Sequence, residues 1–118
     1  MPNNPNHSTL TATLADTQEA HAAHAAILYR LYTEDVAGAI YDCNGGNIGA
    51  LVARYFSGAT ILPAVGLWQR RTENSVVIEI LGTLRDLQMV IHLAGDIKQE
   101  NAQSFVLVTW IRVSRLDV

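Results

Sequence analysis

The sequence predicts a domain of the α+β class, with its elements in the order β-α-β-β-α-β after an N-terminal segment. The first observation is the stretch 60–81, TILPAVGLWQRRTENSVVIEIL, which reads as two apolar strands joined by a polar turn at Gln69–Asn74. The second is that apolar residues recur at helical spacing before and after this pair of strands. The third is an alternation of side chains in residues 27–34 and 103–113, which adds one strand at each end.

Composition limits the number of domains and the class of partner. At 118 residues the chain has room for a single hydrophobic core. Its net charge of −3 argues against nucleic acid as a partner, and its apolar runs are shorter than the ~20 residues that a membrane span needs. The N-terminus has neither the basic start nor the apolar core of a signal peptide, and Cys43 is the only cysteine. We therefore expect a soluble, cytoplasmic protein without disulfides.

The N-terminal quarter of the chain differs in composition from the rest. Residues 1–25 are predicted to form a tail with a short Ala-rich helix, and residues 26–118 to form the folded domain. Asp16 precedes the segment TQEAHAAHAA, and Glu19 follows three residues later, which is the pattern of a capping box. The helix should run from Thr17 to about Ala25.

The first strand and the first helix of the domain come next. Ile27–Glu34 alternates, and its better-buried face should consist of Ile27, Tyr29, Leu31 and Thr33. After the break at Asn44-Gly45-Gly46, apolar residues return at helical spacing at Ile48, Leu51, Val52, Tyr55 and Phe56. We expect a helix at Asn47–Ser57, with Gly58 in the position of a C-cap glycine.

The strands of the central hairpin are expected at Ala59–Gln69 and Ser75–Gly82. Pro63 cannot donate a hydrogen bond to a neighbouring strand. The first of the two strands should therefore lie at an edge of the sheet, or carry a bulge at this residue.

A second helix and a final strand complete the domain. The helix should begin after Thr83, which forms a capping-box pattern with Asp86, and extend to about Asn101. Its apolar stripe is expected at Leu87, Val90, Ile91, Ala94 and Ile97. The last strand should span Gln103–Val113, with Phe105, Leu107, Thr109 and Ile111 on one face and Val106, Val108, Trp110 and Arg112 on the other.

This order of elements is that of the ferredoxin-like plait, an antiparallel sheet with both helices on one face. Two helices cover only one side of the sheet, yet the strands are apolar on both sides. In the strand at 75–82, for example, Val76, Ile78 and Ile80 alternate with Val77 and Leu81. A face that is open to water should alternate to polar residues. We therefore expect a second copy of the chain to cover the other face, in a homo-oligomer that is a dimer or a trimer.

The hairpin contains candidate ligand-binding residues. Arg70 and Arg71 lie in its predicted turn, close to Trp68 and Glu73. Two guanidinium groups can clamp an anion or a nucleotide phosphate, and the indole ring is available for stacking. The alternative interpretation is a solvent-exposed hairpin tip that binds nothing.

Glu79 is a carboxylate within an apolar strand, so it must be paired or placed at an opening. It could act as a general base with a raised pKa. It could also form an ion pair with Arg30, Arg112 or Arg115 at a subunit contact, and this is the interpretation that we favour.

A small dimeric enzyme is a further hypothesis, with acid–base residues in a cavity between the sheet and the helices. Its candidate catalytic residues are Glu79, Tyr32 and His92. No metal or other cofactor is expected. His21 and His24 share a helix face, but two histidines without a third ligand do not define a metal site.

The architecture resembles that of the PII-like signalling proteins and other small ferredoxin-like oligomers. The stretches that carry the resemblance are YRLYTED, the hairpin TILPAVGLWQRRTENSVVIEIL and DIKQENAQSFVLVTW, within Ile27–Val113. The resemblance implies a regulatory or accessory homo-oligomer that binds a small anionic or nucleotide-like ligand near the hairpin turn. The other hypotheses are the small enzyme and a structural or accessory protein of a phage or mobile element that binds no ligand.

Overall fold

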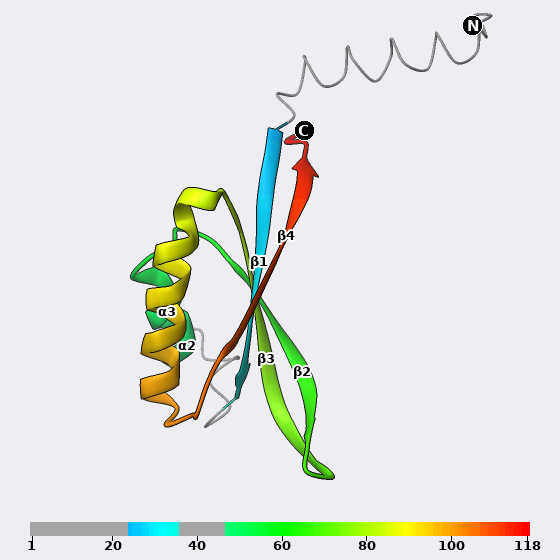
Figure 1. Cartoon of the computed structure of the whole chain (residues 1–118), viewed down its shortest axis with the longest axis vertical. Helices are drawn as coiled ribbons and strands as arrows, with labels where there is room; N and C mark the ends of the chain where they lie inside the picture. The colour runs from blue at the N-terminus through cyan, green and yellow to red at the C-terminus, as the bar shows by residue number, and fades with distance from the viewer. Residues whose placement is uncertain (1–23, 36–46) are drawn as a thin grey trace, which may run out of the picture.

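A computed structural model of the chain describes residues 24–35 and 47–118 (Figure 1). They form a four-stranded antiparallel sheet in the order β2-β3-β1-β4, together with two α-helices. The strands are β1 (His24–Glu34), β2 (Thr60–Trp68), β3 (Arg71–Gly82) and β4 (Leu107–Arg115). The helices are α2 (Asn47–Ala53) and α3 (Leu87–Glu100), and a short 3₁₀ helix, Leu84–Asp86, precedes α3. The α+β class predicted from the sequence is confirmed.

Both helices pack on the same face of the sheet, and the hydrophobic core lies between the two layers (Figure 1). Alternate residues of the two central strands point into this core: Ile27, Tyr29 and Leu31 from β1, and Val76, Ile78 and Ile80 from β3. The helices contribute Ile48, Leu51 and Val52 from α2, and Val90, Leu93, Ala94 and Ile97 from α3. The buried face predicted for β1 is confirmed, and its fourth member, Thr33, is also buried.

The stripe predicted for the second helix is wrong at one position. Leu93 is fully buried, whereas Ile91 is 47% exposed. With 3.6 residues per turn, Ile91 lies about 100° around the helix from Val90. Val90 and Ile97 face the core directly. Leu93 lies next to them on the side away from Ile91, and it is therefore the residue that the core buries.

Hydrogen bonds fix the start of α3 against β1. The capping box predicted at Thr83 is present: its hydroxyl accepts from the backbone N–H of Arg85 at 3.2 Å, and its own N–H donates to Asp86 Oδ2 at 2.8 Å. The phenolic hydroxyl of Tyr29, whose side chain is buried in the core, donates to the carbonyl oxygen of Thr83. A buried strand residue is therefore hydrogen-bonded to the residue that caps the 3₁₀ helix leading into α3.

The end of α3 is fixed against the same strand. The side-chain amide of Asn101 donates to Thr33 Oγ1 and to the carbonyl oxygen of Glu34, both at 3.1 Å. The hydroxyl of Thr33 in turn donates to Gln103 Oε1. These bonds hold the segment between α3 and β4, so that Gln103 belongs to a helix cap and β4 begins at Leu107 instead of at Gln103 as predicted.

The hairpin turn is tighter than predicted. Only Gln69 and Arg70 form the loop, both with left-handed backbone (φ 48° and 63°), and β3 begins at Arg71 instead of at Ser75. Two consecutive residues with positive φ form a type I′ turn, which matches the twist of paired strands. The usual sequence for such a turn is Asn-Gly. Gln69-Arg70 does not have this sequence, and the polar residues after it are typical of a longer turn, so the sequence predicts the turn at Gln69–Asn74.

Three further predictions can be compared with the structure. α2 ends at Ala53 instead of at Ser57, although the next residues remain in a turn, with the N–H of Phe56 donating to the carbonyl of Val52 at 3.0 Å. Pro63 lies in β2, which is an edge strand of the sheet. The helix predicted at 17–25 lies outside the described residues except for its last two positions, which belong to β1. No helix in the described segments is long and apolar enough to cross a membrane.

Replacing Ala102 by glycine should stabilise the fold. Ala102 has φ 52°, and its N–H donates to the carbonyl of Gln99 while that of Gln103 donates to Lys98, which is the Schellman arrangement at a helix end. Glycine adopts this backbone without a Cβ penalty, so Ala102→Gly should raise the free energy of unfolding by about 1 kcal/mol. In the control variant Ala50→Gly, within α2, the same change should lower it by about 0.5–1 kcal/mol. Urea denaturation measures both, and a loss of stability in Ala102→Gly would contradict the assignment.

The Tyr29 hydroxyl should make stability depend on alkaline pH. Burial raises the pKa of Tyr29, and the negative charge of Asp86 raises it further. The folded state therefore holds this proton more tightly than the unfolded state. The stabilisation is complete below the unfolded pKa of about 10 and is lost as the pH rises through the folded pKa.

Tyr29→Phe should lower the free energy of unfolding by about 1 kcal/mol at neutral pH, because the carbonyl of Thr83 loses its donor. Above a pH of about 10 the wild-type protein should lose stability more steeply than the variant. Urea titrations across the alkaline range measure both effects. Parallel pH profiles for the two proteins would show that this hydroxyl is not the group responsible.

Candidate functional site

The face of the sheet opposite the helices is open and mostly apolar. Cross-strand pairs align its large side chains in two rows, Leu62–Val77–Tyr32–Leu107 across all four strands and Leu81–Leu28–Ile111 across three. Five of these seven residues, Tyr32, Leu62, Leu81, Leu107 and Ile111, are between 38% and 51% exposed. This side of the sheet therefore carries two rows of large apolar side chains, separated by the polar row Thr60–Glu79–Arg30–Thr109, and the described residues do not cover them.

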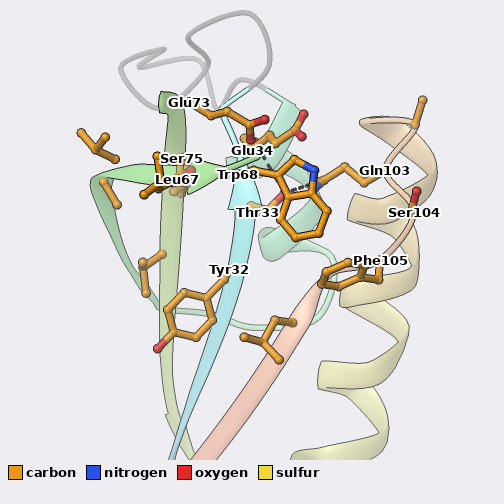
Figure 2. A pocket seen from close by; sticks show the side chains of 17 residues that line it. Tyr32, Thr33, Glu34, Leu67, Trp68, Glu73, Ser75, Gln103, Ser104 and Phe105 are labelled. Atoms are coloured by element: carbon orange, nitrogen blue, oxygen red, sulfur yellow. Dashed lines mark hydrogen bonds between the residues drawn. The ribbon is translucent and has the colours of Figure 1, made fainter. Parts of the chain in front are cut away.

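One end of this open face is hollowed to about 620 Å³ (Figure 2). Three aromatic rings line the hollow, those of Tyr32, Trp68 and Phe105, together with the carboxylates of Glu34 and Glu73. Smaller side chains of the sheet and the segment before β4 complete it, among them Ala64, Ser75, Val77, Gln103, Ser104 and Leu107. The described residues that line it include no Lys, Arg or His.

Local structure explains why these side chains meet. Gly66 lies opposite Glu73 in the β2–β3 ladder, and a Cβ at Gly66 would come within 2.6 Å of Ser75 Oγ. A side chain at position 66 would require the Ser75 hydroxyl to move away, because the two strands of the hairpin carry their side chains close together on the hollow side. Phe105 comes from the segment between α3 and β4, which the hydrogen bonds of Asn101 to β1 hold in place. The hollow therefore has one wall from the hairpin and another from that segment (Figure 2).

The structure separates the four ligand-binding residues predicted in the hairpin. Trp68 and Glu73 line the hollow. Arg70 is in the two-residue turn, and Arg71 pairs with Trp68 at the start of β3, but neither arginine is among the lining residues. Their role as ligand contacts stays a prediction, and any such contact would be made at the hairpin tip.

Most residues that line the hollow are not indicated by the sequence, and Glu34, Gln103 and Phe105 are among them. They come from the end of β1 and the start of the β4 segment, which lie next to the hairpin only because β1 pairs with both β3 and β4. To predict these residues from the sequence, it would be necessary to know which residues of β1 pair with which residues of β3 and β4.

Glu79 forms an ion pair with Arg30, which lies directly opposite it on β1, with 2.8 Å between Arg30 Nε and Glu79 Oε2. The hydrogen bond to this carboxylate raises the pKa of Arg30, because it favours the charged guanidinium. The ion-pair interpretation is confirmed, with both partners in one chain. Glu79 is thus already engaged, which argues against its use as a general base.

The three predicted catalytic residues do not share one cavity. Tyr32 lines the hollow, whereas Glu79 lines a shallower one of about 380 Å³ together with Arg115. His92 is exposed on α3, which covers the opposite face of the sheet. Among the described residues, no three His, Cys, Asp or Glu side chains are grouped as a metal ion would require. The arrangement can hold a small molecule, but it brings together no acid–base set from these candidates.

Comparison with known proteins gave no match to a protein-family model, to a curated protein or to a solved structure.

The Arg30–Glu79 pair should contribute measurably but weakly to the stability of a single chain. The two side chains are 39% and 23% exposed, so a double-mutant cycle with Arg30→Gln and Glu79→Gln should give a small but favourable coupling. Raising the salt concentration from about 0.1 M to about 1 M should reduce this coupling.

The control for this cycle is the pair Arg115–Asp117, in which the carboxylate is 66% exposed. Its coupling should be nearer zero, because water screens it more fully. Urea denaturation of dilute protein measures both cycles. Equal couplings in the two pairs would contradict the view that the apolar face shelters Glu79.

Proposed function

We propose that the protein is a homo-oligomer of the ferredoxin-like class that binds a small molecule and has a regulatory or accessory role in the cytoplasm. A second copy covers the open face of the sheet, and the small molecule occupies the hollow at its end. The observation that carries the proposal is the continuous row of large, exposed apolar side chains on that face.

The size of the open face suits a partner. Strands spaced about 4.8 Å apart and about nine residues long give a four-stranded face of roughly 600 Å² in projection. The whole face, including its polar row, is therefore close to the ~800 Å² that each partner buries in a standard interface. Full coverage of the face would therefore make an interface of ordinary size.

Charge on the open face is compatible with a second copy as that partner. At its centre, Arg30 and Glu79 neutralise each other, so stacking two such faces brings no unpaired charge into the centre of the contact. Symmetric homo-oligomers are the commonest assemblies of soluble proteins. Two copies suffice to cover one open face each, so we propose a dimer, and a trimer is the alternative that sedimentation distinguishes.

The arrangement of elements supports the ferredoxin-like assignment. The strand order β2-β3-β1-β4, with both helices on one face, is the order expected of that plait. The resemblance to PII-like proteins remains a proposal at the level of architecture.

A ligand-binding role has more support than the two other hypotheses. An enzyme that uses Glu79, Tyr32 and His92 would need these groups close together, and they lie in three different places. A purely structural protein would need no concave, aromatic-lined site. A hollow of about 620 Å³ falls within the usual range of ~300–1,000 Å³ for small-molecule sites.

A charge placed on the open face should break the oligomer. Ile111→Glu puts a carboxylate within the apolar surface, where the second copy would have to bury it, and should shift the protein to single subunits at micromolar concentration. The control is Ile91→Glu, the same substitution at a similarly exposed position on α3, which should leave the assembly intact. Analytical ultracentrifugation measures the outcome.

The wild-type protein should sediment as a dimer in the same experiment. A stable, folded single subunit at micromolar concentration, or equal dissociation by the two substitutions, would overturn self-association through this face.

A further inference from the structure

The lining of the hollow has an unbalanced charge. Glu34 and Glu73 both contribute to it, and in the described part of the chain neither of them forms an ion pair. The other carboxylate of the open face, Glu79, is already neutralised by Arg30. Arg70 and Arg71 lie at the hairpin tip outside the lining, so the lining itself is negatively charged and a positively charged ligand would balance it.

The aromatic rings of the hollow suit the same kind of ligand. Tyr32, Trp68 and Phe105 come from three separate parts of the chain, and Trp68 and Phe105 are 58% and 61% exposed. The face of an aromatic ring attracts a cation within about 6 Å, and this attraction strengthens when both groups leave water. Aromatic rings combined with carboxylates are the usual surroundings of a bound ammonium group.

The body of the ligand should be apolar. Between the rings and the carboxylates, the hollow is lined by Ala64, Val77 and Leu107 as well as by small polar side chains. A bare metal ion would use none of this apolar surface, and the described residues hold no group of three metal-ligating side chains. An anion would meet two carboxylates and, among the described lining residues, no basic group.

We propose that the hollow binds a small organic cation, an amine or ammonium compound with an apolar or aromatic body. The positive group lies between Glu34, Glu73 and the indole of Trp68, and the apolar body lies toward Tyr32 and Phe105. The inference rests on the proposed ligand-binding function and assigns its ligand class, which differs from the anion expected from Arg70 and Arg71.

The test compares three probes of the same shape and different charge: 2-phenylethylamine, 2-phenylethanol and 3-phenylpropanoate. Trp110→Phe, a substitution on the helix side of β4, leaves Trp68 as the only tryptophan, so its fluorescence reports on the hollow. The amine should change this fluorescence saturably and bind at least about tenfold more tightly than the alcohol, and the carboxylate should bind most weakly.

Matched variants then attribute the preference to the two carboxylates. Glu34→Gln/Glu73→Gln keeps the shape of both side chains, and should weaken binding of the amine about tenfold while leaving that of the alcohol unchanged. Asp117→Asn also removes a negative charge, but at the far end of β4, and should change the affinity for the amine by less than about twofold. Circular dichroism and sedimentation confirm that the variants are folded and assembled as the wild type.

The outcomes separate this inference from the proposed function. Ala64→Phe fills the hollow and should abolish binding of any ligand there. If the alcohol or the carboxylate binds as tightly as the amine and Ala64→Phe abolishes it, the ligand class is wrong and the ligand site stands. Failure of all three probes to bind, or an unchanged amine affinity in the Glu34→Gln/Glu73→Gln variant, overturns the inference. If the amine binds equally well to Ala64→Phe, the site lies elsewhere, and the ligand-binding part of the proposed function fails with it.

Discussion

The packing of α3 on β1 is the contact on which the rest of the structure depends. Val90, Leu93 and Ile97 belong to one buried core with the inward residues of β1 and β3, and hydrogen bonds from Tyr29 and Asn101 join β1 to the segments just before and just after the helix. Because β1 pairs with both β3 and β4, a helix fixed to one face of β1 also determines which face of β3 and of β4 is buried. The register of the sheet, the side that is buried and the side that is left open all follow from this contact.

The open face and the hollow are therefore two results of one arrangement. With both helices on one side, every second residue of each strand is left on the other, and here many of those residues are large and apolar. At one end the hairpin and the segment before β4 rise on two sides, and the surface becomes concave (Figure 2).

Much of the fold could be predicted from the sequence because its signals are local. Alternation in 27–34 and 75–82 identified the central strands and their buried faces, and the Thr83–Asp86 pattern identified the start of α3. The tip of the hairpin could not be predicted, because Gln69 and Arg70 adopt a backbone that their side chains do not favour, and pairing of the flanking strands imposes it.

Prediction of the candidate site from the sequence is limited in the same way, because only local signals can be read. Trp68 and Glu73 were found because they lie within one hairpin, close together in the sequence. Glu34 and Phe105 are distant in the chain and meet them only through the pairing of β1 with two strands. The two adjacent arginines predict an anion site, yet they lie at the tip of the hairpin, outside the hollow. The charged residues that line the hollow are carboxylates.

Pro63 has a consequence for how copies of this chain can assemble. It lies in β2, at an edge of the sheet, and removes one N–H donor from a strand that could otherwise pair with the edge of another molecule. Edge-to-edge pairing can continue without limit and leads to fibres, whereas stacking of one open face on another is complete once both faces are used. A proline at the border of the sheet thus disfavours open-ended polymers, which is compatible with the closed homo-oligomer proposed above.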